Sequence, residues 1–120
     1  MALHHKLCHA LGGSFGLPHA ETHAIVLPHA TAYNASAAPA AMARVARALG
    51  TDDAAQGLYD LAGRLGTKRA LRDIGMPADG VDAVVGRTVA DPYRNPRPLE
   101  RAAIRGLLTR AWSGEPPRSA

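Results

Sequence analysis

The sequence predicts an all-α fold, a bundle of about six helices in a single domain. Alanine, the strongest helix former, accounts for 25 of the 120 residues. Apolar residues recur at the spacing of a helical face in successive segments, which glycines and prolines separate. No segment alternates apolar and polar residues as a half-buried strand does. We expect the domain to cover residues 1–114, followed by a disordered tail at residues 115–120.

Two helices are expected in the first third of the chain. The first covers residues 3–11 and ends at Gly12-Gly13, because glycine commonly follows the last turn of a helix. The second covers residues 19–33, and Pro28 inside it predicts a kink. The apolar face of the first helix consists of Leu3, Leu7, Cys8 and Leu11.

The next two predicted helices follow Ser36 and Asp53. Ser36 is the expected N-cap of the third helix, which ends at Gly50. Asp53 and Gln56 have the spacing of a capping box at the start of the fourth. The expected inner faces are Met42, Val45, Ala46 and Leu49 in the third helix, and Leu58, Leu61, Ala62 and Leu65 in the fourth.

The rest of the chain predicts one short helical turn and two further helices. The turn stops at Gly75, and Asp79 is the expected cap of the fifth helix. An extended, proline-rich connector at residues 91–98 follows, and Pro98 suits the first position of the last helix. The inner faces are Val81, Val84, Val85, Thr88 and Val89, then Leu99, Ala103, Ile104, Leu107, Leu108 and Trp112, with Arg101 and Arg105 facing solvent.

Composition excludes several classes of protein. The single cysteine excludes a disulfide framework and a cysteine-based zinc finger. No apolar run approaches the ~20 residues that span a membrane. Histidines stand where a signal peptide would have its apolar stretch, so we expect a soluble, cytoplasmic protein. The net charge is +4, but the arginines are scattered among acidic residues and aromatic residues make up only 4%. We therefore expect no nucleic-acid partner.

Histidine is the most unevenly distributed residue, because all six lie within residues 1–29. His5 and His9 are four residues apart on one helical face, where two imidazoles can bind a single metal ion. His19 follows ten residues later, within reach if the glycine-rich loop folds back. The same spacing also occurs on solvated helix faces, and Glu21 is the one nearby acidic residue. The spacing by itself leaves both interpretations open.

Five other residues have two interpretations each. Cys8 fits a small buried side chain better than a nucleophile, and Trp112 fits a core anchor better than an interface residue. Arg94 and Arg97 fit bonds to backbone and carboxylates around the connector better than contacts to an anionic substrate. Lys6 is either a solvated helix residue or a ligand of a substrate carboxylate.

The order of these motifs resembles maleylacetate reductases, a branch of the iron-containing alcohol dehydrogenase family. The resemblance runs from Met1 to Trp112. It is carried by HHKLCH at residues 4–9, LGG at 11–13, LPHAETH at 17–23, VLPH at 26–29, YN at 33–34, NPRP at 95–98 and AW at 111–112.

The resemblance implies a helical C-terminal domain that shares an active-site cleft with an NAD(P)H-binding α/β domain. That Rossmann-type half, with its phosphate-binding loop, belongs to a segment upstream of these residues, and Gly12-Gly13-Ser14 is not that loop. The resemblance also implies that the chain begins inside a helix and is a fragment, and that the complete enzyme is a homodimer.

Roles for single residues follow from the same resemblance. His5 and His19 match two ligands of iron or zinc in the metal-dependent members. His9 matches the histidine beside the nicotinamide, which makes it the candidate for both cofactor contact and proton transfer. Lys6 and His23 are weaker candidates for contacts to a dicarboxylate substrate. Because the reductase branch is not uniformly metal-requiring, the same histidines can instead bind substrate or donate protons.

The implied reaction is the reduction of maleylacetate to 3-oxoadipate with NAD(P)H, a step in the breakdown of aromatic compounds. We expect no activity from these 120 residues without a nucleotide-binding half. The alternatives are another activity of the iron-containing alcohol dehydrogenases, or a non-catalytic helical remnant.

Overall fold

The computed structural model describes residues 2–90 and 97–118. These residues contain six α-helices, three short 3-10 helices and no strand, which confirms the all-α fold. The α-helices are α1 (Ala2–Phe15), α2 (His19–Asn34), α3 (Pro39–Leu49), α4 (Ala54–Arg64), α5 (Val81–Ala90) and α6 (Arg101–Ser113), and the 3-10 helices are η1 (Ala35–Ala37), η2 (Leu71–Ile74) and η3 (Ala78–Gly80). No helix in the described ranges has both the length and the apolar character needed to cross a membrane.

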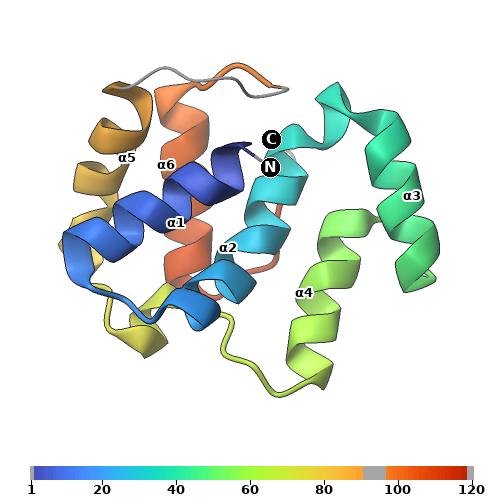
Figure 1. The fold of residues 1–120 in the computed structure, drawn as a ribbon, viewed down its shortest axis with the longest axis horizontal. Helices are drawn as coiled ribbons and strands as arrows, with labels where there is room; N and C mark the ends of the chain where they lie inside the picture. Colours follow the sequence, from blue (N-terminus) through green and yellow to red (C-terminus); the bar gives the residue numbers. More distant parts are fainter. Residues whose placement is uncertain (1, 91–96, 119–120) are drawn as a thin grey trace.

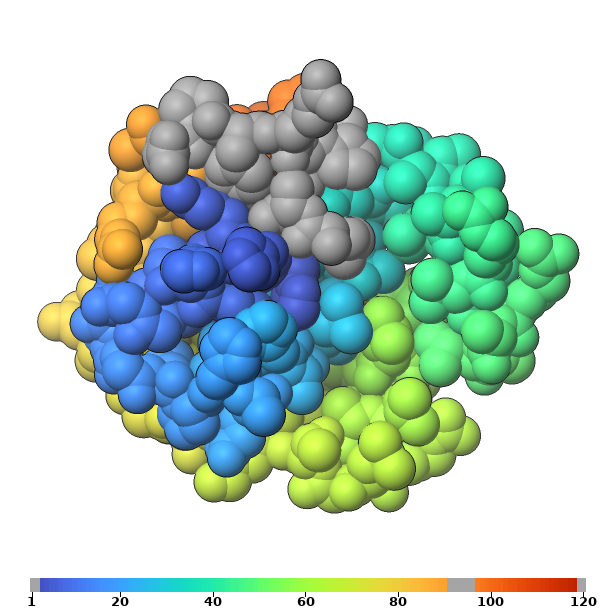
Figure 2. Space-filling view, viewed as in Figure 1, coloured from blue at the N-terminus to red at the C-terminus, as the bar shows by residue number. Residues whose placement is uncertain are grey.

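The hydrophobic core lies between α1, α2, α5 and α6, with η2 beneath them (Figure 1). α3 and α4 pack on each other and reach the rest of the chain chiefly through α2. In Figure 2 they lie at the right of the molecule, in teal and green. The predicted inner faces of the first, fifth and last helices are confirmed by the buried side chains of Leu3, Leu7, Leu11, Val84, Val85, Ile104, Leu107 and Leu108.

The predicted end of the first helix is wrong, because α1 continues through Gly12 and Gly13 to Phe15. The helix stops at Gly16, which has a φ of +61° and donates its N–H to the carbonyl oxygen of Gly12 at 2.9 Å. Each helical glycine costs about 1 kcal/mol relative to alanine. Packing of Phe15 against the core offsets that cost and carries the helix one further turn.

The start of α3 also differs from the prediction. Ser36 lies exposed in η1 and is not an N-cap, whereas Pro39 occupies the first position of α3. Proline is favoured there because its missing N–H has no partner within a helix. The predicted end at Gly50 is confirmed, with a φ of +69°. α2 runs as one helix through Pro28.

The N-cap of α4 is confirmed, but its predicted inner face is only partly right. The side chain of Asp53 accepts a hydrogen bond from the backbone N–H of Gln56 at 3.1 Å. The Gln56 side chain donates to Asp60 instead, so the reciprocal half of the capping box is absent. Leu58 and Leu61 are half-buried, and Leu65 is 70% exposed, which contradicts its predicted burial.

The start of α6 lies three residues after Pro98, which contradicts the predicted first position. The Tyr33 hydroxyl donates to the carbonyl oxygen of Pro98 and accepts the N–H of Glu100. The Arg97 guanidinium lies over the Tyr33 ring at 4.1 Å and donates to the Tyr33 carbonyl oxygen. These contacts fix residues 97–100 outside the helix, so α6 begins at Arg101. Arg97 therefore bonds backbone, as predicted.

Other predictions around the last two helices have mixed outcomes. Asp79 lies within η3, so it is not the cap residue directly before α5. The Trp112 indole donates to the carbonyl oxygen of Met76 at 2.9 Å and packs against the core, which confirms it as an anchor. The predictions for Arg94 and for most of the connector fall on residues 91–96, outside the described residues.

The exposed end of α4 leads to a prediction about association. Leu65 borders an open apolar pocket of about 160 Å³ between α2 and α4, lined by Ala24, Leu27, Pro28, Leu58, Leu61, Ala62, Leu65 and Thr67. Such a surface favours self-association of the isolated chain.

Leu65→Lys should shift sedimentation toward the monomer without lowering the melting temperature, because Leu65 contributes little buried area. Ala48→Lys, which adds the same charge at an exposed position of α3, should leave association unchanged. A wild-type chain that stays strictly monomeric at high concentration contradicts this prediction.

Candidate active site

Four of the six histidines line one pocket between α1 and the start of α2. Its volume is about 220 Å³, and its walls are His5, Cys8, His9, Gly12, Gly13, His19 and His23. This pocket is consistent with the prediction that the loop before α2 folds back, because His19 lines it together with His5 and His9. Gly12 and Gly13 form part of the wall, and a Cβ at Gly12 would meet no atom within 4 Å.

Local sequence explains how the two helices meet. The left-handed conformation at Gly16 reverses the chain, and the buried side chain of Leu17 fixes the loop to the core. Pro18 directly precedes α2, and the Thr22 hydroxyl donates to the Pro18 carbonyl oxygen at 2.6 Å. As a result, His19 begins α2 on the same pocket that His5 and His9 of α1 line.

The pocket histidines form two ring pairs, one on each helix. The rings of His5 and His9 are 5.1 Å apart between centroids, and those of His19 and His23 are 4.1 Å apart. Both pairs have the i, i+4 spacing that stacks side chains on one helical face. His5, His9 and His19 are exposed, so a ligand in the pocket can reach all three imidazoles.

Sequence reasoning missed a second histidine contact, between His4 and His23. Their rings meet edge to face with centroids 4.9 Å apart, and Nε2 of His4 lies 3.0 Å from the carbonyl oxygen of His23. Burial lowers the pKa of His4, and burial with the neighbouring imidazoles of His19 and His4 lowers the pKa of His23. The protein environment therefore favours the neutral imidazole at both positions.

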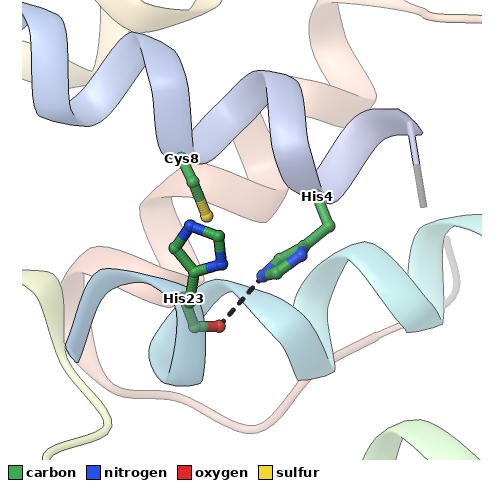
Figure 3. Close-up of side chains that lie close together, drawn as sticks. All are labelled: His4, Cys8 and His23. Atoms are coloured by element: carbon green, nitrogen blue, oxygen red, sulfur yellow. Dashed lines mark hydrogen bonds between the residues drawn. The ribbon is translucent and has the colours of Figure 1, made fainter. Parts of the chain in front are cut away.

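His4, Cys8 and His23 also bring three potential metal ligands together, with their ligand atoms within 4.8 Å of one another (Figure 3). His4 was not among the residues predicted for the site, but its i, i+4 relation to Cys8 was the signal that could have revealed this cluster. Burial raises the pKa of the Cys8 thiol to about 12. This pKa favours the protonated thiol, and the burial of Cys8 confirms its interpretation as a small buried side chain.

The remaining predicted site residues lie elsewhere. Lys6 is half-buried on α1 and does not line the histidine pocket. Glu21 lies on α2 beside a different hollow that Lys68 borders. No carboxylate lines the histidine pocket among the described residues, so its possible metal ligands are four imidazoles and the Cys8 thiol. Imidazole donors suit iron or zinc, and His5 and His19, the predicted ligands, both line this pocket. Gly12 and Gly13 are helical, so they do not form a phosphate-binding loop.

The comparisons with known proteins agree with this architecture. Residues 1–112 match the model of the Fe-containing alcohol dehydrogenase family, C-terminal. The maleylacetate reductase of Burkholderia cepacia is 56% identical over 117 residues, which cover 98% of this chain and 33% of that protein.

Two solved structures superpose closely on the described fold. A protein described as a putative alcohol dehydrogenase from Ralstonia eutropha JMP134 has a TM-score of 0.94 and 60% identity, covering 98% of this chain and 34% of that one. Maleylacetate reductase from Agrobacterium tumefaciens has a TM-score of 0.93 and 51% identity, covering 98% and 33%. The chain thus spans about a third of the length of these relatives. By its sequence and its helical fold, the chain belongs to the iron-containing alcohol dehydrogenase family and corresponds to the C-terminal domain of its maleylacetate reductases.

Proposed function

We propose that this chain supplies the helical half of an NAD(P)H-dependent oxidoreductase that reduces maleylacetate to 3-oxoadipate. The observation that carries the proposal is the 56% identity to a maleylacetate reductase over nearly the whole chain. The histidine pocket supports it, because exposed imidazoles line a hollow that opens at the surface. The nucleotide-binding half corresponds to the part of the relatives that this chain does not match.

The proposed reaction adds two hydrogens to the carbon–carbon double bond conjugated with the substrate's ketone. A hydride leaves the reduced nicotinamide and forms a C–H bond, while the electron pair of the double bond moves toward the ketone as an enolate. A proton then completes the second C–H bond, and the cofactor leaves oxidised. The protein's part is to orient both reactants, supply the proton and stabilise the enolate.

His9 is the proposed proton donor, since its exposed imidazole lies in the pocket and imidazole is the commonest general acid in enzymes. His5 and His19 are the proposed ligands of an iron or zinc ion, which when bound polarises the substrate's oxygen as a Lewis acid. His23 borders the same pocket and is a proposed contact for a substrate carboxylate. Lys6 remains a weaker proposal, because it lies outside the pocket wall.

A second candidate, reduction or oxidation of a simple alcohol substrate, is favoured by one observation. The structure from Ralstonia eutropha that is described as a putative alcohol dehydrogenase is 60% identical to this chain. The same assay distinguishes the two candidates, because maleylacetate and short alcohols can be offered in parallel.

The test joins this chain to the N-terminal part of the Burkholderia cepacia relative, and follows NADH and NADPH consumption with maleylacetate. We expect turnover by the joined protein and none by the isolated chain. Turnover by the isolated chain would show that the nucleotide-binding half is dispensable. A well-folded joined protein that turns over alcohols but not maleylacetate would refute the proposed substrate.

A further inference from the structure

The cluster of His4, Cys8 and His23 lies beside the proposed catalytic histidines but uses a different face of α1. His4 and Cys8 are one helical turn apart and face α2, whereas His5 and His9 are exposed. Figure 3 shows the Cys8 sulfur directed at the His23 ring, and the hydrogen-bonded nitrogen of His4 at the end of its ring nearest His23. The side chains of α1 and α2 thus approach one point from two sides.

From this convergence we propose that His4, Cys8 and His23 form a zinc-binding site, distinct from the metal site attributed to His5 and His19. The donor set consists of one thiolate and two imidazoles, which are the ligands that Zn²⁺ prefers in proteins. The site has three protein ligands, and a water molecule supplies the fourth. Water has access because His23 and Cys8 also border the open histidine pocket.

The geometry requires only a small adjustment. The ligand atoms lie within 4.8 Å of one another, whereas the atoms of a tetrahedral zinc site are separated by roughly 3.5 Å. Closing by about 1 Å is within reach of side-chain torsions, since both histidines are only partly buried. The i, i+4 spacing of His4 and Cys8 lets one rigid helix hold two ligands in register.

Binding exchanges existing contacts for coordinate bonds. Nε2 of His4 gives up its hydrogen bond to the His23 carbonyl oxygen, its proton moves to Nδ1, and the freed lone pair binds the ion. The Cys8 thiol loses its proton to solvent as the sulfur–zinc bond forms, so one proton is released for each ion bound. Zinc binding should therefore tighten as the pH rises. Ligation also ties α1 to α2 at the open end of the pocket and orients His23 beside His19.

The test uses Co²⁺ as a spectroscopic replacement for Zn²⁺ on the full chain under reducing conditions. Cys8 is the one cysteine of the sequence, so a thiolate-to-cobalt charge-transfer band can arise only from this residue. We expect that band, its loss on adding Zn²⁺, and its absence in Cys8→Ser. Loss of a residue that only supports a metal ligand weakens metal binding by ~10–100-fold. His4→Gln and His23→Gln each remove a ligand, so each should weaken Co²⁺ binding by more than that.

The double variant His5→Gln/His19→Gln is the matched control, and it should retain the charge-transfer band at the wild-type affinity. Circular dichroism of every variant establishes that the helices are intact. Absence of the band in the folded wild-type chain overturns the proposal. So does a band that survives His4→Gln and His23→Gln but disappears in the double variant, because the ion then binds the family's ligand pair. The readout requires no catalysis, so the result is independent of the proposed reductase activity.

Discussion

Acidification from pH 6.5 to about pH 4 is expected to lower the free energy of unfolding by about 3 kcal/mol, because one buried side chain, His29, becomes protonated more easily in the unfolded chain. His29 lies on α2 and is 1% exposed, and neither ring nitrogen has a hydrogen-bond partner in the structure. Burial and the positive charge of Arg110 lower its pKa to about 4, against the opposing effect of the Glu115 carboxylate.

The direction follows from the two protonation states. Below pH 6.5 the unfolded chain protonates His29 while the folded chain keeps it neutral, so unfolding takes up a proton. The stabilisation is complete above pH 6.5, falls as the pH decreases, and is lost below about pH 4. Other groups titrate in the same range, so the contribution of His29 must be measured as a difference between variants.

Urea unfolding of the wild type and His29→Leu at closely spaced pH values measures that difference. His29→Leu should reduce the fall in stability over this range by about 3 kcal/mol. It should fold at neutral pH, because an apolar side chain gives up no hydrogen bond there. His9→Gln is the matched control, since His9 is exposed, and its pH dependence should follow the wild type. Parallel curves for the wild type and His29→Leu would contradict the assignment.

Replacement of His9 by alanine in the joined, active protein should lower kcat by about 10²–10⁴-fold with little effect on KM. The expectation rests on the proposed role of His9 as proton donor. Its side chain is exposed in the pocket and contacts the His5 ring, so truncation removes a reacting group and no core contact. Alanine also preserves α1, because it is the best helix former.

Steady-state kinetics with maleylacetate and NADH, with and without added imidazole, test this role. Imidazole should partly restore kcat in His9→Ala, because it can supply the missing proton, and should not affect the parent protein. Arg44→Gln on the exposed surface of α3 is the control for nonspecific effects and should retain the parent kcat. An unchanged kcat in His9→Ala excludes the proton-transfer role.

Helix ends were the least predictable part of this fold. Gly12-Gly13 has every local feature of a helix end, yet α1 continues to Phe15 because that ring packs on the core. Pro98 suits a first helical position, but contacts with Tyr33, which lies 65 residues earlier, keep the chain outside the helix there. Local propensity amounts to about 1 kcal/mol at such positions, and tertiary contacts outweigh it. Asp53 and Gly50 were predicted correctly because both act on their own helix.

The histidine pocket was partly predictable. Spacing placed His5 and His9 on one face of α1, and the turn before His19 allowed α2 to fold back. Spacing could not show which face of α1 meets α2, so the contact of His4 with His23 was missed. Packing of Leu3, Leu7 and Leu11 into the core sets the rotation of α1, and that rotation directs His4 and Cys8 toward α2.

The helical class, most helix positions and the family were predictable from the amino-acid sequence, because alanine content, apolar spacing and ordered histidine motifs are properties of the chain alone. The exposure of Leu65, the burial of His29 without a partner, and the meeting of His4, Cys8 and His23 became visible in the folded molecule. Each of these depends on how two helices are rotated against each other. That rotation is set by the shape of the shared core, a sum over many residues that no single motif contains.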